Sequence, residues 1–200
     1  MGVVDQTFHE EYENFLAPSE CKGISEIIRH SEEEILSIPN ANASNYYSGT
    51  TKQFNVYNWL NHREIKKFDL PKRLFRLPFL HNIDHIMVQC WANILRQGEN
   101  IGPHIHASEV HSTKPDDQFY ACNLFISGNT NTTTYYEDTG YTQNAVGCLS
   151  VLSPSIEHSV PTHLFQAPRI SIAMDIYIHP LSFHMKDLYP NRFNLYERTI

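Results

Sequence analysis

Two histidines one residue apart, in the segment Pro103-His104-Ile105-His106, are the first feature of the sequence that points to chemistry. In an extended chain the side chains at positions i and i+2 point to the same side, so His104 and His106 can bind one metal ion together. The chain contains 12 histidines, and a His-x-His pair therefore arises easily by chance. The pair predicts a metal site only if other residues join it.

A second group of residues supports such a site. The segment Glu157-His158-Ser159 follows the apolar run 146–152 and a short turn. Arg169 comes eleven positions after His158, and Ser171 shares its face of the next predicted strand. A keto acid that chelates a metal needs a bidentate cation and a hydrogen-bond donor for its distal carboxylate. Because an arginine inside a β core needs a polar partner, Arg169 and Ser171 fit that role.

These segments together resemble the core of the 2-oxoglutarate/iron(II) oxygenases, in the branch with a W-x-N strand, a glycine turn and a P-H-x-H segment. The resemblance covers residues 85–180, and it is carried by Gln89–Gly98, Gly102–His106, Phe119–Gly128, Tyr135–Asp138, Ser153–Val160 and Pro168–Ala173. It implies a mainly β fold, the double-stranded β-helix (jelly roll, cupin-like). It also implies Fe(II) as the metal, 2-oxoglutarate as co-substrate, dioxygen as oxidant, and hydroxylation as the default reaction.

Carried over position by position, the resemblance makes His104 the first iron ligand and His158 the distal ligand. It makes Arg169 and Ser171 the clamp for the 2-oxoglutarate carboxylate. Tyr120 and Asn123 are further candidate contacts of the co-substrate. Only one of these two can face inward on a regular strand, and we favour Tyr120.

The second iron ligand is where this sequence departs from the family. The position two residues after the first ligand is usually Asp or Glu, and here it is His106. His106 then completes a three-histidine face, or Glu109 or His111 in the following loop replaces it. The sequence leaves these alternatives open, since two histidines and one carboxylate are the usual ligands of such iron sites.

The elements that must position these residues are mostly strands. A helical spacing of apolar residues runs from Ser19 to Leu36 and stops before Pro39. Trp59 and Leu60 favour a short helix against the core. We then expect strands over 85–95, 119–127, 132–136, 146–153 and 169–179. In the last of these, alternate isoleucines share one face, and Arg169, Ser171 and Asp175 lie on the other. We therefore expect one domain over 1–200, with a helical N-terminal region over 1–80, a β-helix core over 83–180 and a tail over 181–200 that covers a sheet edge.

Composition excludes several classes of protein. The formal net charge is −7, and the chain has no basic cluster longer than Lys66-Lys67, which argues against nucleic acid as a partner. No apolar run is long enough to cross a bilayer, and residues 1–10 do not have the pattern of a signal peptide. The four cysteines, Cys21, Cys90, Cys122 and Cys148, form no C-x-x-C pair. We expect buried free thiols and a cytoplasmic protein.

The sequence leaves the prime substrate and the oligomeric state open. A protein side chain, a nucleotide, a lipid and a small molecule are all compatible with it, because specificity would come from loops and the N-terminal third. Two rival interpretations remain. One is a cupin-like zinc or nickel protein that acts as an isomerase, hydrolase or binder without 2-oxoglutarate. The other is a structural jelly roll whose histidines are incidental.

Overall fold

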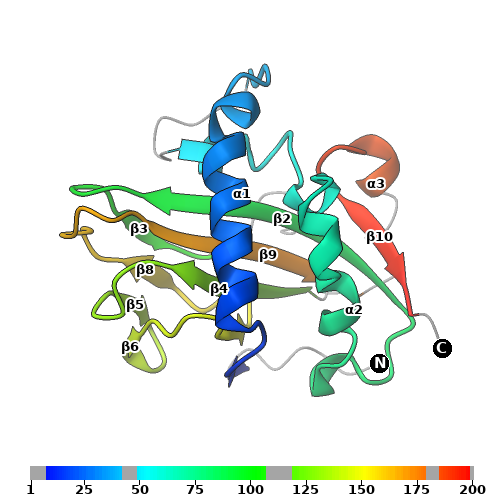
Figure 1. Cartoon of the computed structure of the whole chain (residues 1–200). Coiled ribbons are helices and arrows are strands. Elements are labelled where there is room, and N and C mark those ends of the chain that lie inside the picture. Colours follow the sequence, from blue (N-terminus) through cyan, green and yellow to red (C-terminus); the bar gives the residue numbers. More distant parts are fainter. Residues whose placement is uncertain (1–7, 42–48, 107–118, 179–184, 199–200) are drawn as a thin grey trace.

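Two antiparallel sheets that face each other form the body of the protein in the computed structural model, which describes residues 8–41, 49–106, 119–178 and 185–198 (Figure 1). The larger sheet has the strand order β1-β7-β4-β9-β2-β10. Its strands are β1 His9–Tyr12, β2 His85–Leu95, β4 Phe119–Ser127, β7 Leu149–Leu152, β9 Arg169–Tyr177 and β10 Asn194–Glu197. The smaller sheet has the order β3-β8-β5-β6, with β3 Ile101–His104, β5 Thr133–Tyr136, β6 Gly140–Gln143 and β8 His158–Val160.

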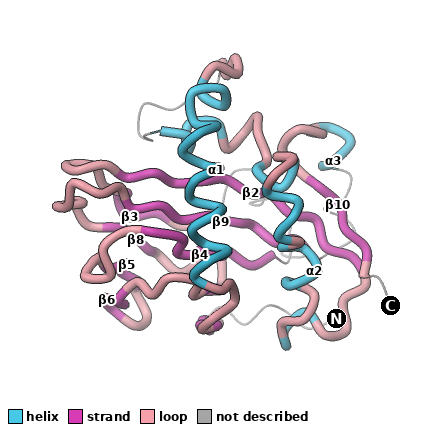
Figure 2. Tube along the Cα trace, in the orientation of Figure 1, coloured by secondary structure: helices cyan, strands magenta, loops and turns pink. Residues whose placement is uncertain are grey.

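Helices cover the outer face of the larger sheet, and Figure 2 shows how strands and helices separate into layers. Helix α1, Pro18–Leu36, crosses the strands of that sheet (Figure 1). Its buried residues Cys21, Ile24, Ile28 and Ile35 fall on one stripe of the helix, which packs against the core. Each isoleucine buried there contributes about 1.5–3 kcal/mol. The remaining helical elements are η1 Gly49–Gln53, η2 Trp59–Asn61, η3 Ile65–Phe68, α2 Leu70–Leu74, η4 Pro78–Leu80 and α3 Met185–Leu188.

Strand β9 is the centre of the larger sheet, between β4 and β2. Both of its faces are buried. Ile170, Ile172, Met174 and Ile176 belong to the main core cluster together with α1. The alternate residues, which include Arg169 and Asp175, face the space between the two sheets. This strand therefore holds the apolar core on one side and a row of polar groups on the other.

The fold class predicted from the sequence is confirmed: the protein is mainly β, with helices on one sheet. The long strands 85–95 and 119–127 have the predicted bounds, whereas β7 is shorter than the predicted 146–153. The helix begins at Pro18, and the Glu20 carboxylate accepts a hydrogen bond from the Ala17 N–H, at 2.9 Å. The tail pairs with β2 through β10, as expected of a segment that covers an edge.

All four cysteines are free, and Cys90 and Cys122 are buried, as predicted; Cys21 is buried too. Cys148 is the exception, because it is only partly buried. Among the described residues, no helix combines the length and the apolar character that a membrane span needs.

Candidate metal centre and co-substrate cavity

A cavity of about 170 Å³ lies between the two sheets. Side chains from both sheets line it, so that the residues of the predicted site are gathered from distant segments of the chain. Its polar lining residues include Asn93, His104, His106, Asn123, Thr134, His158, Arg169, Ser171, Asp175 and Arg192. Phe54, Trp91 and Ala173 are among its less polar walls.

Two of the histidines are brought together by strand pairing. Strands β3 and β8 are antiparallel neighbours, and His104 lies directly opposite His158 in their register. Side chains opposite each other in such a pair have Cβ atoms about 4.5–5.5 Å apart. The two rings accordingly lie 4.3 Å apart between centroids. Strand β3 is at the edge of its sheet, where Pro103 removes no hydrogen bond that a neighbouring strand needs.

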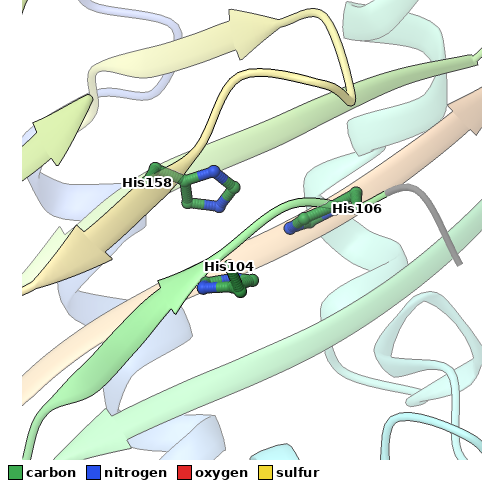
Figure 3. Close-up of side chains that lie close together, drawn as sticks. All are labelled: His104, His106 and His158. Carbon is green, nitrogen blue, oxygen red and sulfur yellow. The ribbon is translucent and has the colours of Figure 1, made fainter. Parts of the chain in front are cut away.

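His106 joins this pair from just beyond the end of β3 (Figure 3). Its backbone N–H donates to the Pro154 carbonyl at 2.9 Å, which ties the segment to the loop before β8. The three histidines each have a ring nitrogen within 4.8 Å of those of the other two. Figure 3 shows the three rings gathered around one space. A single metal ion could be bound by all three.

The Nδ1 atom of each ring already has a partner. His104 Nδ1 lies 2.9 Å from the Gly102 carbonyl, and His158 Nδ1 lies 3.1 Å from the Ile156 carbonyl. His106 Nδ1 lies 2.5 Å from the Asp175 carboxylate. A histidine whose Nδ1 donates to such an acceptor presents Nε2 as a free lone pair, and this is how metal-bound histidines are usually oriented. The three-histidine face is therefore fixed in the tautomer that a metal requires.

The electrostatics of the cluster favour neutral rings. Burial lowers the pKa of His158 well below its usual value, and the neighbouring His106 and His104 lower it further. Burial also lowers the pKa of His104, and His106 adds to that effect. Because only the neutral imidazole binds a metal, these shifts prepare the site for one. The donor set of this cavity thus fits a divalent transition metal.

Arg169 is the other unusual group of the cavity, since it is completely buried. One of its terminal nitrogens donates to Ser171 Oγ and the other to Thr134 Oγ1, both at 3.2 Å. Its Nε has no hydrogen-bond partner, and no carboxylate of the described residues lies within 4.0 Å of it. Burial lowers the pKa of Arg169 to about 10, so the guanidinium is still charged at neutral pH. The guanidinium also lies 5.4 Å from the centre of the Phe125 ring. A buried cation with only hydroxyl and ring partners is costly unless an anion joins it.

The structure reverses the sequence-based preference between Tyr120 and Asn123. Asn123 lines the cavity. Tyr120 lies on the opposite face of β4, where its ring packs at 5.2 Å from Phe8 and 4.5 Å from Phe79. Side chains alternate along a strand, and three positions separate these two residues, so the choice depended on which face of β4 is inside. Two residues named as alternative ligands, Glu109 and His111, lie outside the described residues.

Three lining residues were not given a role from the sequence. Asp175 was placed on the inward face of its strand, and that position was the only available signal for its contact with His106. Trp91 belongs to the main core cluster, and its ring also lines the cavity 5.5 Å from the His106 ring. Thr134 lies in β5, and no local sequence pattern predicts where that strand lies relative to Arg169.

No protein-family model matches the chain, and no curated protein sequence matches it. Solved structures do resemble it. The viral collagen prolyl hydroxylase of Paramecium bursaria Chlorella virus-1, solved with 2-oxoglutarate, has a TM-score of 0.61 at 15% identity, over 88% of this chain and 98% of that one. HygX of Streptomyces hygroscopicus, solved with nickel and 2-oxoglutarate, has a TM-score of 0.60 at 7% identity, over 86% and 82% of the two chains.

A third similar structure is a prolyl hydroxylase of Trichoplax adhaerens in complex with a peptide of hypoxia inducible factor. It has a TM-score of 0.56 at 14% identity, over 85% of this chain and 83% of that one. At these identities the likeness establishes the fold. The jelly roll predicted from the sequence is thus the fold of known 2-oxoglutarate and iron(II) oxygenases.

Proposed function

We propose that this chain is a non-haem iron(II) dioxygenase that uses 2-oxoglutarate as co-substrate and hydroxylates a prime substrate. The observation that carries the proposal is Arg169. This fully buried cation, with an unpaired Nε, lines the same cavity as the three-histidine cluster. A dicarboxylic keto acid is the kind of ligand that would satisfy both ends of that cavity at once.

His104, His106 and His158 would hold the iron through Nε2. Bound iron supplies the oxidative chemistry, in which one atom of dioxygen enters succinate as 2-oxoglutarate loses carbon dioxide and the other enters a C–H bond of the substrate as a hydroxyl. Arg169 and Ser171 would orient the co-substrate by its distal carboxylate, with Thr134 holding the guanidinium. Asn123 offers the cavity a further polar contact.

The rival function, a cupin-like metal protein without 2-oxoglutarate, uses the histidines equally well. In such a protein, however, no anion would pair with Arg169. A buried guanidinium without an anion is destabilising, so Arg169 favours the function that uses 2-oxoglutarate. The free cysteines fit the reducing, cytoplasmic compartment that we expected from the sequence.

The test is co-substrate turnover in the presence of Fe(II) and air, followed as succinate formed per 2-oxoglutarate consumed. The wild-type protein should form succinate slowly even without a prime substrate, and His158→Ala should form none. Equal succinate formation by both proteins would contradict the proposal. His163→Ala is a matched control, since His163 is a buried histidine whose Nε2 lies 2.7 Å from the Ala167 carbonyl, outside the cluster.

A further inference from the structure

The cavity contains a second cation, Arg192, which the proposed function does not use. Arg192 comes from the segment between α3 and β10. Its Nε donates to Gln89 Oε1 at 3.1 Å, and its guanidinium lies over the rings of Phe193, at 4.8 Å, and Phe54, at 5.6 Å. Its backbone carbonyl accepts a hydrogen bond of 2.9 Å from the fully buried Asn58. The side chain is therefore held in a defined position from several sides.

Arg192 and Arg169 mark different ends of the cavity. Gln89, which holds Arg192, pairs with Asp175, whereas Arg169 bonds to Ser171. Ser171 and Asp175 are four positions apart along β9, which corresponds to roughly 13 Å. His106 contacts Asp175, so the histidines lie towards the Arg192 end. A five-carbon keto acid that extends from Arg169 to the metal position would have both of its carboxylates occupied there, one at Arg169 and one at the metal. Arg192 is left for another ligand.

The Arg192 guanidinium has no direct carboxylate partner at this end of the cavity. No carboxylate of the described residues lies within 4.0 Å of the Arg192 guanidinium. Asp175, whose charge acts on Arg192 from a greater distance, is in contact with His106. Burial lowers the pKa of Arg192, which is the sign of a partly desolvated cation. A negatively charged ligand group would give this guanidinium the direct partner that it lacks.

An aromatic wall connects this cation to the histidines. Phe54, below the Arg192 guanidinium, lies 5.9 Å from the Trp91 ring, and Trp91 lies 5.5 Å from the His106 ring. A ligand that reaches from Arg192 to the metal position must run along these rings. Its middle portion is then best apolar, because flat aromatic surfaces offer dispersion and little hydrogen bonding.

We propose that the prime substrate is a small organic acid, whose carboxylate binds Arg192 and whose apolar body lies along Phe54 and Trp91 with a C–H bond at the metal. This inference rests on the proposed function and names its substrate class. A carboxylate fits better than a phosphate ester, since one guanidinium balances a single negative charge and a phosphate carries about −1.5 to −2. Arginine also matches a carboxylate through two parallel hydrogen bonds.

The experiment compares acids with their uncharged amides on protein that is loaded anaerobically with Fe(II) and saturating 2-oxoglutarate, which keeps Arg169 occupied. The probes are phenylacetate with phenylacetamide and hexanoate with hexanamide, and the readouts are the change in the visible band of the loaded site and the shift in Tm. We expect at least one acid to bind ten times more tightly than its amide. Arg192→Met should abolish this preference, and Arg192→Lys should keep some of it.

Arg198→Met is the matched control. Arg198 belongs to the same C-terminal segment and lies 5.1 Å over Phe75, but it does not line the cavity. This variant should keep the full preference for acids. Equal binding of acid and amide by the wild type, no binding of either, tighter binding of phenyl phosphate than of phenylacetate, or an unchanged preference in Arg192→Met would each overturn the inference. If the loaded band itself fails to form in the wild type, the proposed function has failed instead.

Discussion

The Asp175 carboxylate lies 2.5 Å from His106 Nδ1, and both side chains are at least nine-tenths buried. The contact joins the larger sheet to the segment that follows β3 in the smaller one. It places a carboxylate directly behind the histidine that stands where the oxygenases that the sequence resembles usually have a carboxylate ligand. The negative charge is therefore retained at this site, but one side chain further from the metal position.

The first prediction concerns this contact. Asp175→Asn should weaken Fe(II) binding by about 10- to 100-fold, because a metal-bound histidine loses basicity and orientation without its carboxylate partner. Isothermal titration with Fe(II) under nitrogen measures the affinity. Asp138→Asn is the control, since Asp138 contacts His9 at 2.9 Å and does not line the cavity. Equal affinity of the Asp175→Asn variant and the wild type would remove Asp175 from the metal site.

His106→Asp tests whether the site accepts the carboxylate ligand that is usual in the oxygenases that the sequence resembles. We expect a loss of Fe(II) affinity of at least about 100-fold, because the shorter side chain faces Asp175 and two like charges at this distance oppose each other. The double variant His106→Asp with Asp175→Asn should recover some of the affinity. Wild-type affinity in the single variant would show that the three-histidine face is not required.

Arg169→Met should separate metal binding from co-substrate binding. Each hydrogen bond to a charged group contributes about 1.5–3 kcal/mol. The loss of two such bonds should therefore weaken the binding of 2-oxoglutarate by at least about 100-fold. Fe(II) affinity should stay within about threefold of the wild type, since Arg169 contacts none of the three histidines in the structure. The 2-oxoglutarate affinity of Ser171→Ala should lie between those of the wild type and Arg169→Met. Unchanged 2-oxoglutarate affinity in Arg169→Met would exclude it as the clamp.

Gly147→Ala tests how the N-terminus of α1 is attached to the sheet. A Cβ at this position would lie 2.1 Å from the Leu16 carbonyl oxygen, and the backbone has φ +81°. We expect a loss of unfolding free energy of more than about 3 kcal/mol, since positive φ alone costs about 1–2 kcal/mol. Gly140→Ala has a similar φ of +77° with open space around it, and it should lose only that smaller amount. Equal urea midpoints for the two variants would mean that the clash is relieved.

The elements of the fold that the sequence predicted well are those in which one periodic pattern decides the structure. The inward row of β9 follows from strict alternation, and it placed Arg169, Ser171 and Asp175 on one face before their partners were known. The stripe of α1 was equally clear. The short strands β1, β3, β6, β8 and β10 were missed, because three or four residues carry little local signal and their pairing is decided by the sheet that they join.

The residues of the site also divide into those that the sequence identified and those whose contacts depend on packing. His104, His106 and His158 were identified by residue type and by resemblance. The pairing of β3 with β8 brings His104 and His158 together, and His106 joins them from just beyond the end of β3. The contact of His106 with Asp175 joins positions 69 residues apart, and the position of Arg192 depends on how the tail docks beside Gln89. Neither contact has a counterpart in local sequence, since both arise from the packing of one element on another.

An anaerobic titration of the metal-free protein, first with Fe(II) and then with 2-oxoglutarate, tests the proposed metal and co-substrate site most directly when it is followed by visible absorption. We predict one Fe(II) per chain and then a charge-transfer band that saturates at one 2-oxoglutarate per iron. Iron binding without any such band would contradict the use of 2-oxoglutarate and favour the cupin-like alternative. A protein that binds no metal at all would contradict the three-histidine centre itself.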